Sequence, residues 1–529
     1  MIMRLRPLAF IAAMLMLSSC ASVPVEAQEA PVLSTPFEEN NRAELTPYED
    51  VSAFYQEVAK RSDAAGIETI GQSRQGRDLN LLTLTNTDYK TPWQAQRSGK
   101  PIFFIGAQIH GDEPAGKEAL MEFARDLAFG ELNYMLDEII FLFVPQMNPD
   151  GAELGEWGTR ANAAGYNINR DFPRLINPEA RAVADVLLEW RPHVVVDAHE
   201  LMGPPRIYDF YTWHPNNPNS PDELYEYASD HLIPEIVDAL EANDYSHVIY
   251  HTPGGLFTEP EEGIYVPLYG RTLNDYAEAI GAISILFESL REQDARVDIE
   301  DRSRRQYVAM KAMGEHIARN GDEVVAAVQQ AQQSLLNYGP EDSIAVEVDH
   351  AKTETITYRV AEMEEEEGVS PWQWETTGEI LELEVPVYAD LQVTRHRERP
   401  AAYIIEPHRK ELAEELRRHD IRVERLQESA ELNAEEFEII SREIGENPYE
   451  GYIPVSVETS LNPINREFEK GSWLVRTDQP EAALIFKLME PEDENSLVIT
   501  GELTTEVREG TTLPIYRLPE AGNLSTKIW

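Results

Sequence analysis

Four short apolar runs, each followed or ended by polar residues that can carry chemistry, constrain the fold of this chain more than any other feature. They are Ile102–Ala107, Ile139–Val144, Val194–Asp197 and Ile283–Phe287, and amphipathic stretches separate them. Strands that are apolar throughout are usually buried on both faces, as in a largely parallel sheet covered by helices. The pattern predicts an α/β fold, with helices over Pro114–Leu127 and Pro178–Trp190.

Polar residues that could form a site follow each of these predicted strands. Open α/β sheets place their ligand sites beyond the carboxyl ends of the strands, where residues far apart in sequence can meet. We therefore expect one site at that edge, built from His110, the turn Asn148-Pro149-Asp150-Gly151, His199 and Glu288.

The length of 529 residues exceeds what one compact core usually holds. We predict a signal peptide over 1–19, a tether over 20–47, a catalytic domain over 48–337 and a mixed α/β accessory domain over 343–529. The accessory domain carries no catalytic constellation. Its predicted elements are a helix over His408–His419 and strands over Ile380–Val387, Ala401–Ile405, Ile421–Leu426, Trp473–Arg476 and Leu497–Thr500.

The first residues have the pattern of an export signal. Arg4 and Arg6 precede the apolar run Leu8–Leu17, which is too short to cross a bilayer, and Leu-Ser-Ser stands directly before Cys20. This resembles a bacterial lipoprotein signal, which implies a lipid on Cys20 and an exported protein of the periplasm or cell surface. Contact with the membrane would be through that lipid only. An ordinary cleaved signal with an incidental cysteine is the alternative.

Charge and cysteine content exclude several classes of function. The formal charge of −50 produces a field that repels nucleic acid and anionic lipid head groups, so we expect no nucleic-acid partner. Cys20 is the single cysteine, so the chain has no internal disulfide and no thiolate metal site. Neither composition nor charge predicts an oligomeric state.

Two histidines and a glutamate have the composition of a catalytic zinc site. His110 and Glu113 lie three positions apart on a loop after a predicted strand, and His199 follows another predicted strand toward the same edge. Two imidazoles and one carboxylate suit zinc and leave a ligand position open for water. His193 is interpreted as structural.

Two arginines and a further glutamate complete the set of candidate residues. Arg160 and Arg170 lie in one irregular, amide-rich segment, and the planar guanidinium suits bidentate capture of a carboxylate. Glu288 ends an apolar run, where a carboxylate is costly unless it faces a cleft, a metal or a partner. A general base is one use for it, and a salt bridge with Arg291 is the alternative.

In this order, the segments resemble the zinc carboxypeptidase family typified by the pancreatic carboxypeptidases, over residues 48–336. Ile70–Arg77 is similar to the family's Gly-x-Ser-x-x-Gly-Arg opening. The resemblance implies a mixed, mostly parallel sheet flanked by helices, one zinc ion, and hydrolysis of the C-terminal bond of a peptide or protein substrate. It also implies the residue roles: His110, Glu113 and His199 as metal ligands, Arg160 on the scissile carbonyl, Asn169 and Arg170 on the terminal carboxylate, and Glu288 as general base.

Some positions depart from the family pattern or leave it open. Asn167 replaces an aspartate that orients a zinc-bound histidine, and Asp171 stands where asparagine is frequent. The tyrosine that closes over the substrate is either Tyr265 or Tyr269. The resemblance also implies that the segment His247–Arg271 contains the pocket for the terminal side chain, where three glutamates would favour basic residues: Glu259, Glu261 and Glu262.

Two other functions fit part of the pattern. A zinc amidohydrolase related to aspartoacylases and succinylglutamate desuccinylase has a similar metal triad and an Asn-Arg element. A lipoprotein that kept the fold but lost catalysis would bind peptides only. The Asn-Pro-Asp-Gly turn, Arg160 and the long segment before Glu288 favour the peptidase.

Overall fold

The computed structural model describes residues 33–251, 263–267, 270–292, 294–336, 342–366, 368–371, 374–448, 453–501, 503 and 507–529. Residues Ser34–Trp529 form one compact unit. Several predicted features lie outside the described residues: the signal peptide, Cys20, the first part of the tether, Tyr269, and the glutamates at 259, 261 and 262. The predicted division into domains at 337–343 stays a prediction.

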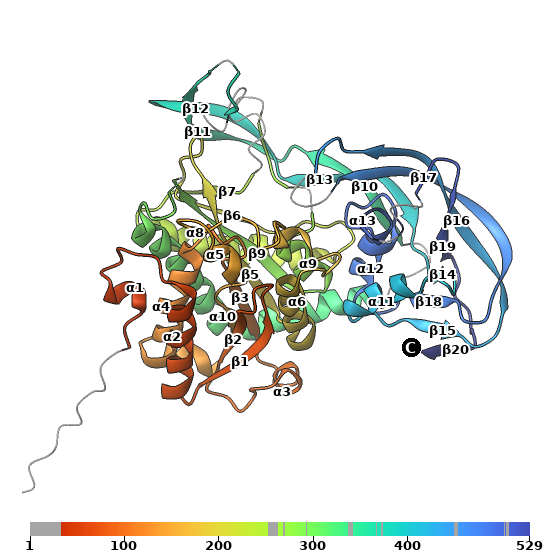
Figure 1. Ribbon diagram of the computed structural model, residues 1–529, viewed down its shortest axis with the longest axis horizontal. Coiled ribbons are helices and arrows are strands. Elements are labelled where there is room, and N and C mark those ends of the chain that lie inside the picture. The colour runs from red at the N-terminus through yellow and green to blue at the C-terminus, as the bar shows by residue number, and fades with distance from the viewer. Residues whose placement is uncertain are drawn as a thin grey trace, which may run out of the picture. The chain divides into compact units, whose positions relative to one another are not determined.

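An eight-stranded mixed sheet forms the first part of the unit (Figure 1). Its order is β1-β2-β4-β3-β5-β9-β6-β7, and the four central strands β4, β3, β5 and β9 are parallel. Antiparallel pairs flank them on both sides. The bounds are β1 (Ala65–Gln72), β2 (Asp78–Leu84), β3 (Ile102–Ala107), β4 (Ile140–Val144), β5 (Val194–Met202), β6 (Phe210–Trp213), β7 (His247–Ile249) and β9 (Ile283–Arg291).

Helices cover this sheet, and every residue of β3 and β4 is buried, as the apolar runs predicted. Among the covering helices, α4 packs against α10, α9 contacts β5 and β9, and α6 contacts β1. The helices of this part are α1 (Pro36–Glu39), α2 (Tyr48–Arg61), α3 (Pro92–Gln96), α4 (Ala115–Phe129), η1 (Asn133–Asp137), α5 (Pro149–Ala152), η2 (Ile168–Arg170), α6 (Pro178–Trp190), α7 (Asp222–Tyr227), η3 (Ala228–Leu232), α8 (Ile233–Glu241), α9 (Leu273–Ala279) and α10 (Ile299–Leu336). The predicted mixed, mostly parallel sheet flanked by helices is confirmed.

The strands that carry His199 and Glu288 are longer than predicted. β5 continues to Met202 and β9 continues to Arg291, because the parallel ladder between them persists through the pair His199 and Glu288. The two residues therefore lie inside neighbouring strands rather than beyond their ends. The sequence interpretation ended both strands early, since polar residues are uncommon in buried strands.

The folded region also begins earlier than predicted. Helix α1 lies within the segment expected to be a tether, and a capping box at Thr35 and Glu38 starts it. Phe37 is fully buried against Ala115 and Ile299, so residues near 37 belong to the folded unit.

The described residues of the region 343–529 form further sheets and three helices. β10 (Ser343–Ala351) pairs with β13 (Asp390–Glu398), and β11 (Glu354–Glu364) pairs with β12 (Glu375–Tyr388), which reaches β8 (Ile264–Tyr265) of the first part. A seven-stranded sheet has the order β17 (Val455–Phe468), β16 (Ala430–Ile444), β19 (Thr512–Leu518), β14 (Ala402–Ile405), β18 (Trp473–Arg476), β15 (Glu424–Leu426) and β20 (Thr526–Ile528). The helices are α11 (Lys410–Arg418), α12 (Ala482–Met489) and α13 (Leu497–Thr500).

The predicted strand at Leu497–Thr500 is wrong, because this segment forms helix α13. The hydroxyl of Ser496 accepts a hydrogen bond from the amide of Val498 and caps the first turn. Four apolar residues have no periodicity that separates a buried strand from a buried helix. Within the described part of the chain, no helix combines the length and apolar character that a membrane span requires.

Candidate active site

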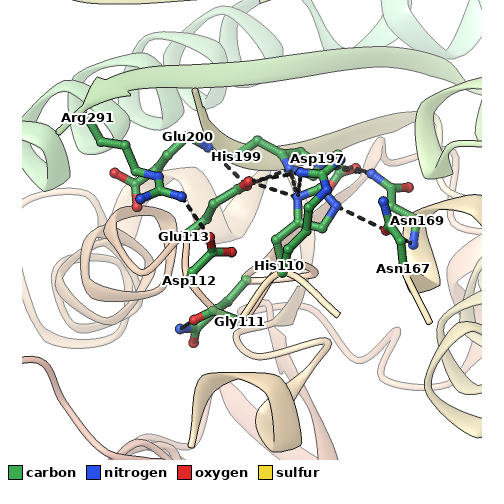
Figure 2. A network of polar contacts seen from close by, with 12 residues as sticks. His110, Gly111, Asp112, Glu113, Asn167, Asn169, Asp197, His199, Glu200 and Arg291 are labelled. Carbon is green, nitrogen blue, oxygen red and sulfur yellow. Dashed lines mark hydrogen bonds and ion pairs between the residues drawn. The ribbon is translucent and has the colours of Figure 1, made fainter. Parts of the chain in front are cut away.

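Two histidines and a glutamate converge at the carboxyl edge of the eight-stranded sheet (Figure 2). His110 and Glu113 come from the turn between β3 and α4, and His199 comes from β5. Glu113 bridges the imidazoles, with Oε1 2.8 Å from His110 Nδ1 and Oε2 2.8 Å from His199 Nδ1. The two Nδ1 atoms are 3.1 Å apart, and all three side chains are buried.

This geometry fits a single zinc ion. One ligand atom from each residue lies within 4.8 Å of the others. Zinc bonds of about 2.0–2.2 Å to nitrogen and oxygen bring neighbouring ligand atoms to about 3–3.5 Å from each other, close to the spacing found here. Two nitrogens and one carboxylate also form the donor set of catalytic zinc sites that keep an open position.

Outer hydrogen bonds direct both Nδ1 atoms toward the metal position. His199 Nε2 lies 2.7 Å from Oδ2 of Asp197, and His110 Nε2 lies 3.1 Å from Oδ1 of Asn167. Such contacts fix the tautomer and the orientation of a ligating imidazole. The residue that replaces the family's aspartate, Asn167, thus contacts a histidine of the metal site through its side-chain carbonyl (Figure 2).

Burial and charge also set the protonation of these ligands. Burial, with the nearby guanidinium of Arg160, lowers the pKa of His110 to about 4. Burial raises the pKa of Glu113, but the adjacent His110 and His199 hold it well below its usual range. Burial opposes protonation of His199, yet the carboxylates of Asp197 and Glu113 raise its pKa well above the ordinary value.

The turn that carries His110 and Glu113 packs closely against the Asn-Pro-Asp-Gly segment. A Cβ atom on Gly111 would lie 2.1 Å from the carbonyl carbon of Gly151, so only glycine fits there. Asp150 of this segment accepts hydrogen bonds from Ser73 Oγ and Arg77 Nη1, each at 2.7 Å. The opening motif and the turn therefore brace the metal-ligand loop rather than reach the metal.

Glu288 lies next to the metal ligands, directly across the β5–β9 ladder from His199. Its side chain is buried and lines the cavity, and its Oε2 atom has no hydrogen-bond partner in the described part of the chain. Burial raises its pKa to about 8, against the opposing charge of His199. A carboxylate with a raised pKa and an unused oxygen can accept a proton.

The three other predicted site residues surround the same centre. Arg160 Nη1 lies 3.1 Å from His110 Nδ1 and 3.5 Å from Glu113 Oε1. Arg170 lines the cavity, and its Nη1 donates to the carbonyl of Asn169. The side chain of Asn169 is buried, with Nδ2 3.1 Å from Asp197 Oδ2 and Oδ1 accepting from the amide of Leu273. The side-chain amide of Asn169 therefore also helps to fix Asp197, which is the hydrogen-bond partner of His199.

All seven predicted site residues border one cavity of about 810 Å³. The region 343–529 adds Pro454 and Glu494 to the wall of this cavity. Sequence reasoning predicted an accessory region without a catalytic constellation and did not predict this contribution. The sequence of a loop does not indicate which cavity its residues will border in the folded chain.

Arg206 and Tyr250 also line the cavity. Arg206 belonged to no motif and was missed, whereas Tyr250 lies in the segment His247–Arg271 that was predicted to contain the side-chain pocket. One candidate lies elsewhere. Tyr265 instead stacks on Tyr388, with ring centroids 4.4 Å apart, and is absent from the described lining of the cavity. The alternative role of Glu288, a salt bridge with Arg291, is not found among the described residues, because Arg291 pairs with Asp112.

Fold and site together define a metal-centre protein of the α/β class, with the metal ligands at the carboxyl edge of a mixed sheet. Residues 51–201 match the family model of zinc carboxypeptidases, peptidase M14. The chain therefore carries a region similar to zinc carboxypeptidases and is a metallohydrolase whose cofactor is one zinc ion.

Several known carboxypeptidases are similar to this chain. Carboxypeptidase 2 of Trichophyton equinum is 24% identical over 464 residues, which cover 84% of this chain and 81% of the relative. Carboxypeptidase E of Caenorhabditis elegans is 36% identical over 121 residues, or 20% of this chain and 25% of the relative. The solved carboxypeptidase A of Helicoverpa armigera is similar with a TM-score of 0.41 and 17% identity, over 52% of this chain and 74% of that one.

Proposed function

We propose that this protein removes the C-terminal residue from peptides, with Glu288 as general base. The observation that carries the proposal is the buried Oε2 of Glu288, which has no partner in the described part of the chain and lies beside the ligand His199. Arg160 and Arg170 lie around the same cavity. A base, a metal position and cationic groups thus converge on one substrate-sized space.

The residues of the cavity divide the chemistry among them. A zinc ion bound to His110, Glu113 and His199 would supply Lewis acidity that activates water and polarises the carbonyl. The carboxylate of Glu288 takes a proton from the attacking water and returns it to the leaving amine. The guanidinium of Arg160 donates to the carbonyl oxygen as negative charge develops on it.

Restriction to the chain end follows from capture of the terminal carboxylate. The guanidinium fork of Arg170 matches the two oxygens of a carboxylate, and it borders the cavity that holds Glu288. Asn169 would add a contact to the same carboxylate, while its amide also bonds to Asp197. A peptide without that terminal charge loses this anchor.

The test uses the full chain loaded with zinc and peptides of one sequence with free or amidated C-termini. We expect release of the last residue from the free peptide, loss of that release with a chelator, and little cleavage of the amide. Mass spectrometry measures the products. Hydrolysis of N-acetyl or N-succinyl amino acids in place of peptides would indicate the amidohydrolase, and peptide binding without cleavage would indicate a binding protein.

We further propose that Cys20 carries a lipid and anchors the exported protein to a membrane. The support is the sequence around it, with Arg4 and Arg6 before the apolar run Leu8–Leu17. Replacing Cys20 by Ala should move the protein from the membrane fraction to the soluble fraction in a bacterial host. Equal partition of both proteins would exclude the anchor.

A further inference from the structure

The cavity contains a buried guanidinium that forms no direct ion pair with the described residues. Arg206 is 4% exposed and lines the cavity together with Glu288. Its Nη1 and Nη2 donate to the carbonyls of Met202 and His251, at 3.5 Å and 3.2 Å, and its Nε is buried without a partner. Glu288 lines the same cavity and interacts with Arg206 electrostatically, but no carboxylate of the described residues forms a direct ion pair with it.

Two other arginines of the cavity differ in this respect. Arg291 is paired with Asp112 at 2.7 Å, and Arg160 lies 3.5 Å from Glu113. Arg206 keeps three of its five N–H groups outside its two carbonyl bonds. A buried guanidinium without an ion-pair partner is unfavourable, which favours a ligand that brings a carboxylate to it.

The apolar residues that line the cavity with Arg206 indicate which kind of ligand would fit. Leu286 lies two residues before Glu288 on β9 and pairs with Trp213 of β6, so apolar side chains border the cavity beside the base. Met202 and Tyr250 add to the lining. An aliphatic stem contacts such a wall well, and a carboxylate at its end would reach a guanidinium.

Arg206 is also held firmly in place. The carbonyl that it contacts belongs to His251, whose Nε2 lies 2.9 Å from the hydroxyl of Tyr358 on β11. His251 and Tyr358 are fully buried. The guanidinium is therefore positioned before any ligand arrives, which reduces the entropic cost of binding.

We infer that Arg206 recognises the carboxylate of an acidic side chain, so that the enzyme prefers peptides ending in glutamate or aspartate. This inference rests on the proposed function, since it names the substrate class of the same site. It opposes the preference for basic residues that the glutamates at 259, 261 and 262 suggested, and these lie outside the described residues. A charge-assisted bidentate pair in a water-poor cavity discriminates a carboxylate from its neutral amide.

Binding of free L-glutamate and L-glutamine to the zinc-loaded full chain tests the inference without requiring turnover. The two ligands share the α-carboxylate and differ only in the charge of the side chain. We expect glutamate to bind about 10- to 100-fold more tightly, as measured by calorimetry. Equal binding of the two by the wild-type protein would overturn the inference, even if peptides are hydrolysed.

Arg206→Met is the informative variant, because it keeps an unbranched apolar stem and removes the charge. We expect it to bind glutamate and glutamine equally, whereas Arg319→Met, on the exposed surface of α10, keeps the preference. Equal weakening of both ligands would assign Arg206 to the α-carboxylate and overturn the assignment to the side chain. If Arg206→Met does not fold, the wild-type comparison still decides. Cleavage of paired peptides ending in Glu or Gln separately tests the proposed function.

Discussion

Buried charges are arranged in opposite ways in the seven-stranded sheet and in the cavity of the eight-stranded sheet. Next to the seven-stranded sheet, Arg397 contacts Glu490 at 2.7 Å and Glu492 at 2.6 Å and also donates to the hydroxyl of Thr459. Arg517 reaches the other oxygen of Glu490 at 3.1 Å. These charges neutralise each other within the protein.

In the cavity, some charged side chains have polar atoms that form no hydrogen bond with the described residues. Oε2 of Glu288 and Nε of Arg206 are buried without a hydrogen-bond partner among the described residues. A buried charge is expensive in both regions, but only a closed network offsets that cost within the folded chain. The comparison indicates that charges paired within the protein serve stability. Charged groups that lack a protein partner are available to bind a proton, a metal or a substrate.

Replacement of Glu288 by Gln should produce the largest effect. We expect kcat to fall about 10²- to 10⁴-fold because the amide cannot accept the proton of water. Zinc content and Tm should stay near wild type, since Oε2 makes no bond in the described part of the chain. Glu241→Gln, at the exposed end of α8, is the matched control and should keep full activity. Wild-type turnover by the zinc-loaded Glu288→Gln protein would remove this residue from the mechanism.

The converse experiment removes a charge from the closed network. Arg397→Met leaves Glu490 and Glu492 buried without their main partner, so we expect a loss of about 3–5 kcal/mol in the free energy of unfolding. Arg319→Met breaks an exposed pair with Glu235 and should cost only about 0–1 kcal/mol. Urea unfolding measures both. At temperatures where Arg397→Met is folded, an unchanged kcat/KM is expected, and a selective loss of activity would contradict the division between the two regions.

Glu278 on α9 is a buried acid whose cost should appear as a dependence of stability on pH. Burial raises its pKa to about 8, although Lys487 of α12 opposes the shift. Because the folded state holds this proton more tightly than the unfolded state, stability should fall as the pH rises from 4.5 to about 8.

Glu278→Gln should remove this dependence. We expect the variant to be more stable than wild type at pH 9, on the order of 3 kcal/mol, and to differ little at pH 4.5. Thermal unfolding at a fixed scan rate across this pH range measures the effect, with Glu241→Gln as control. A parallel decline in the wild type and in Glu278→Gln would show that another group causes the pH dependence.

The metal centre was predictable from sequence because its residues follow apolar runs that parallel strands align at one edge. The turn after β3 and the strand β5 bring His110, Glu113 and His199 together as expected. Glu288 lies opposite His199 in the β5–β9 ladder, and both strands extend further than the apolar runs indicated. Periodicity thus identifies which strands meet, while polar residues inside a strand hide where it ends.

Residues that owe their position to tertiary contacts could not be predicted. Arg206 is placed by carbonyls of Met202 and His251, and His251 in turn contacts Tyr358 of the region 343–529. Glu494 reaches the cavity from a loop of the same region. A pattern of local spacing contains no information about such contacts, so sequence reasoning assigned these residues no role.

The smallest expected effect concerns the neutral group that orients one metal ligand. Asn167 Oδ1 lies 3.1 Å from His110 Nε2, where a carboxylate would raise the basicity of the imidazole more strongly. Asn167→Ala should weaken zinc binding about 10- to 100-fold, and Asn167→Asp should strengthen it. Competition with a chelator at fixed pH measures the Kd, and Asn243→Ala on an exposed turn is the control. If zinc affinity is the same with Asn, Ala and Asp at position 167, the contact does not orient His110. Asn167 would then serve stability only, as the paired charges next to the seven-stranded sheet do.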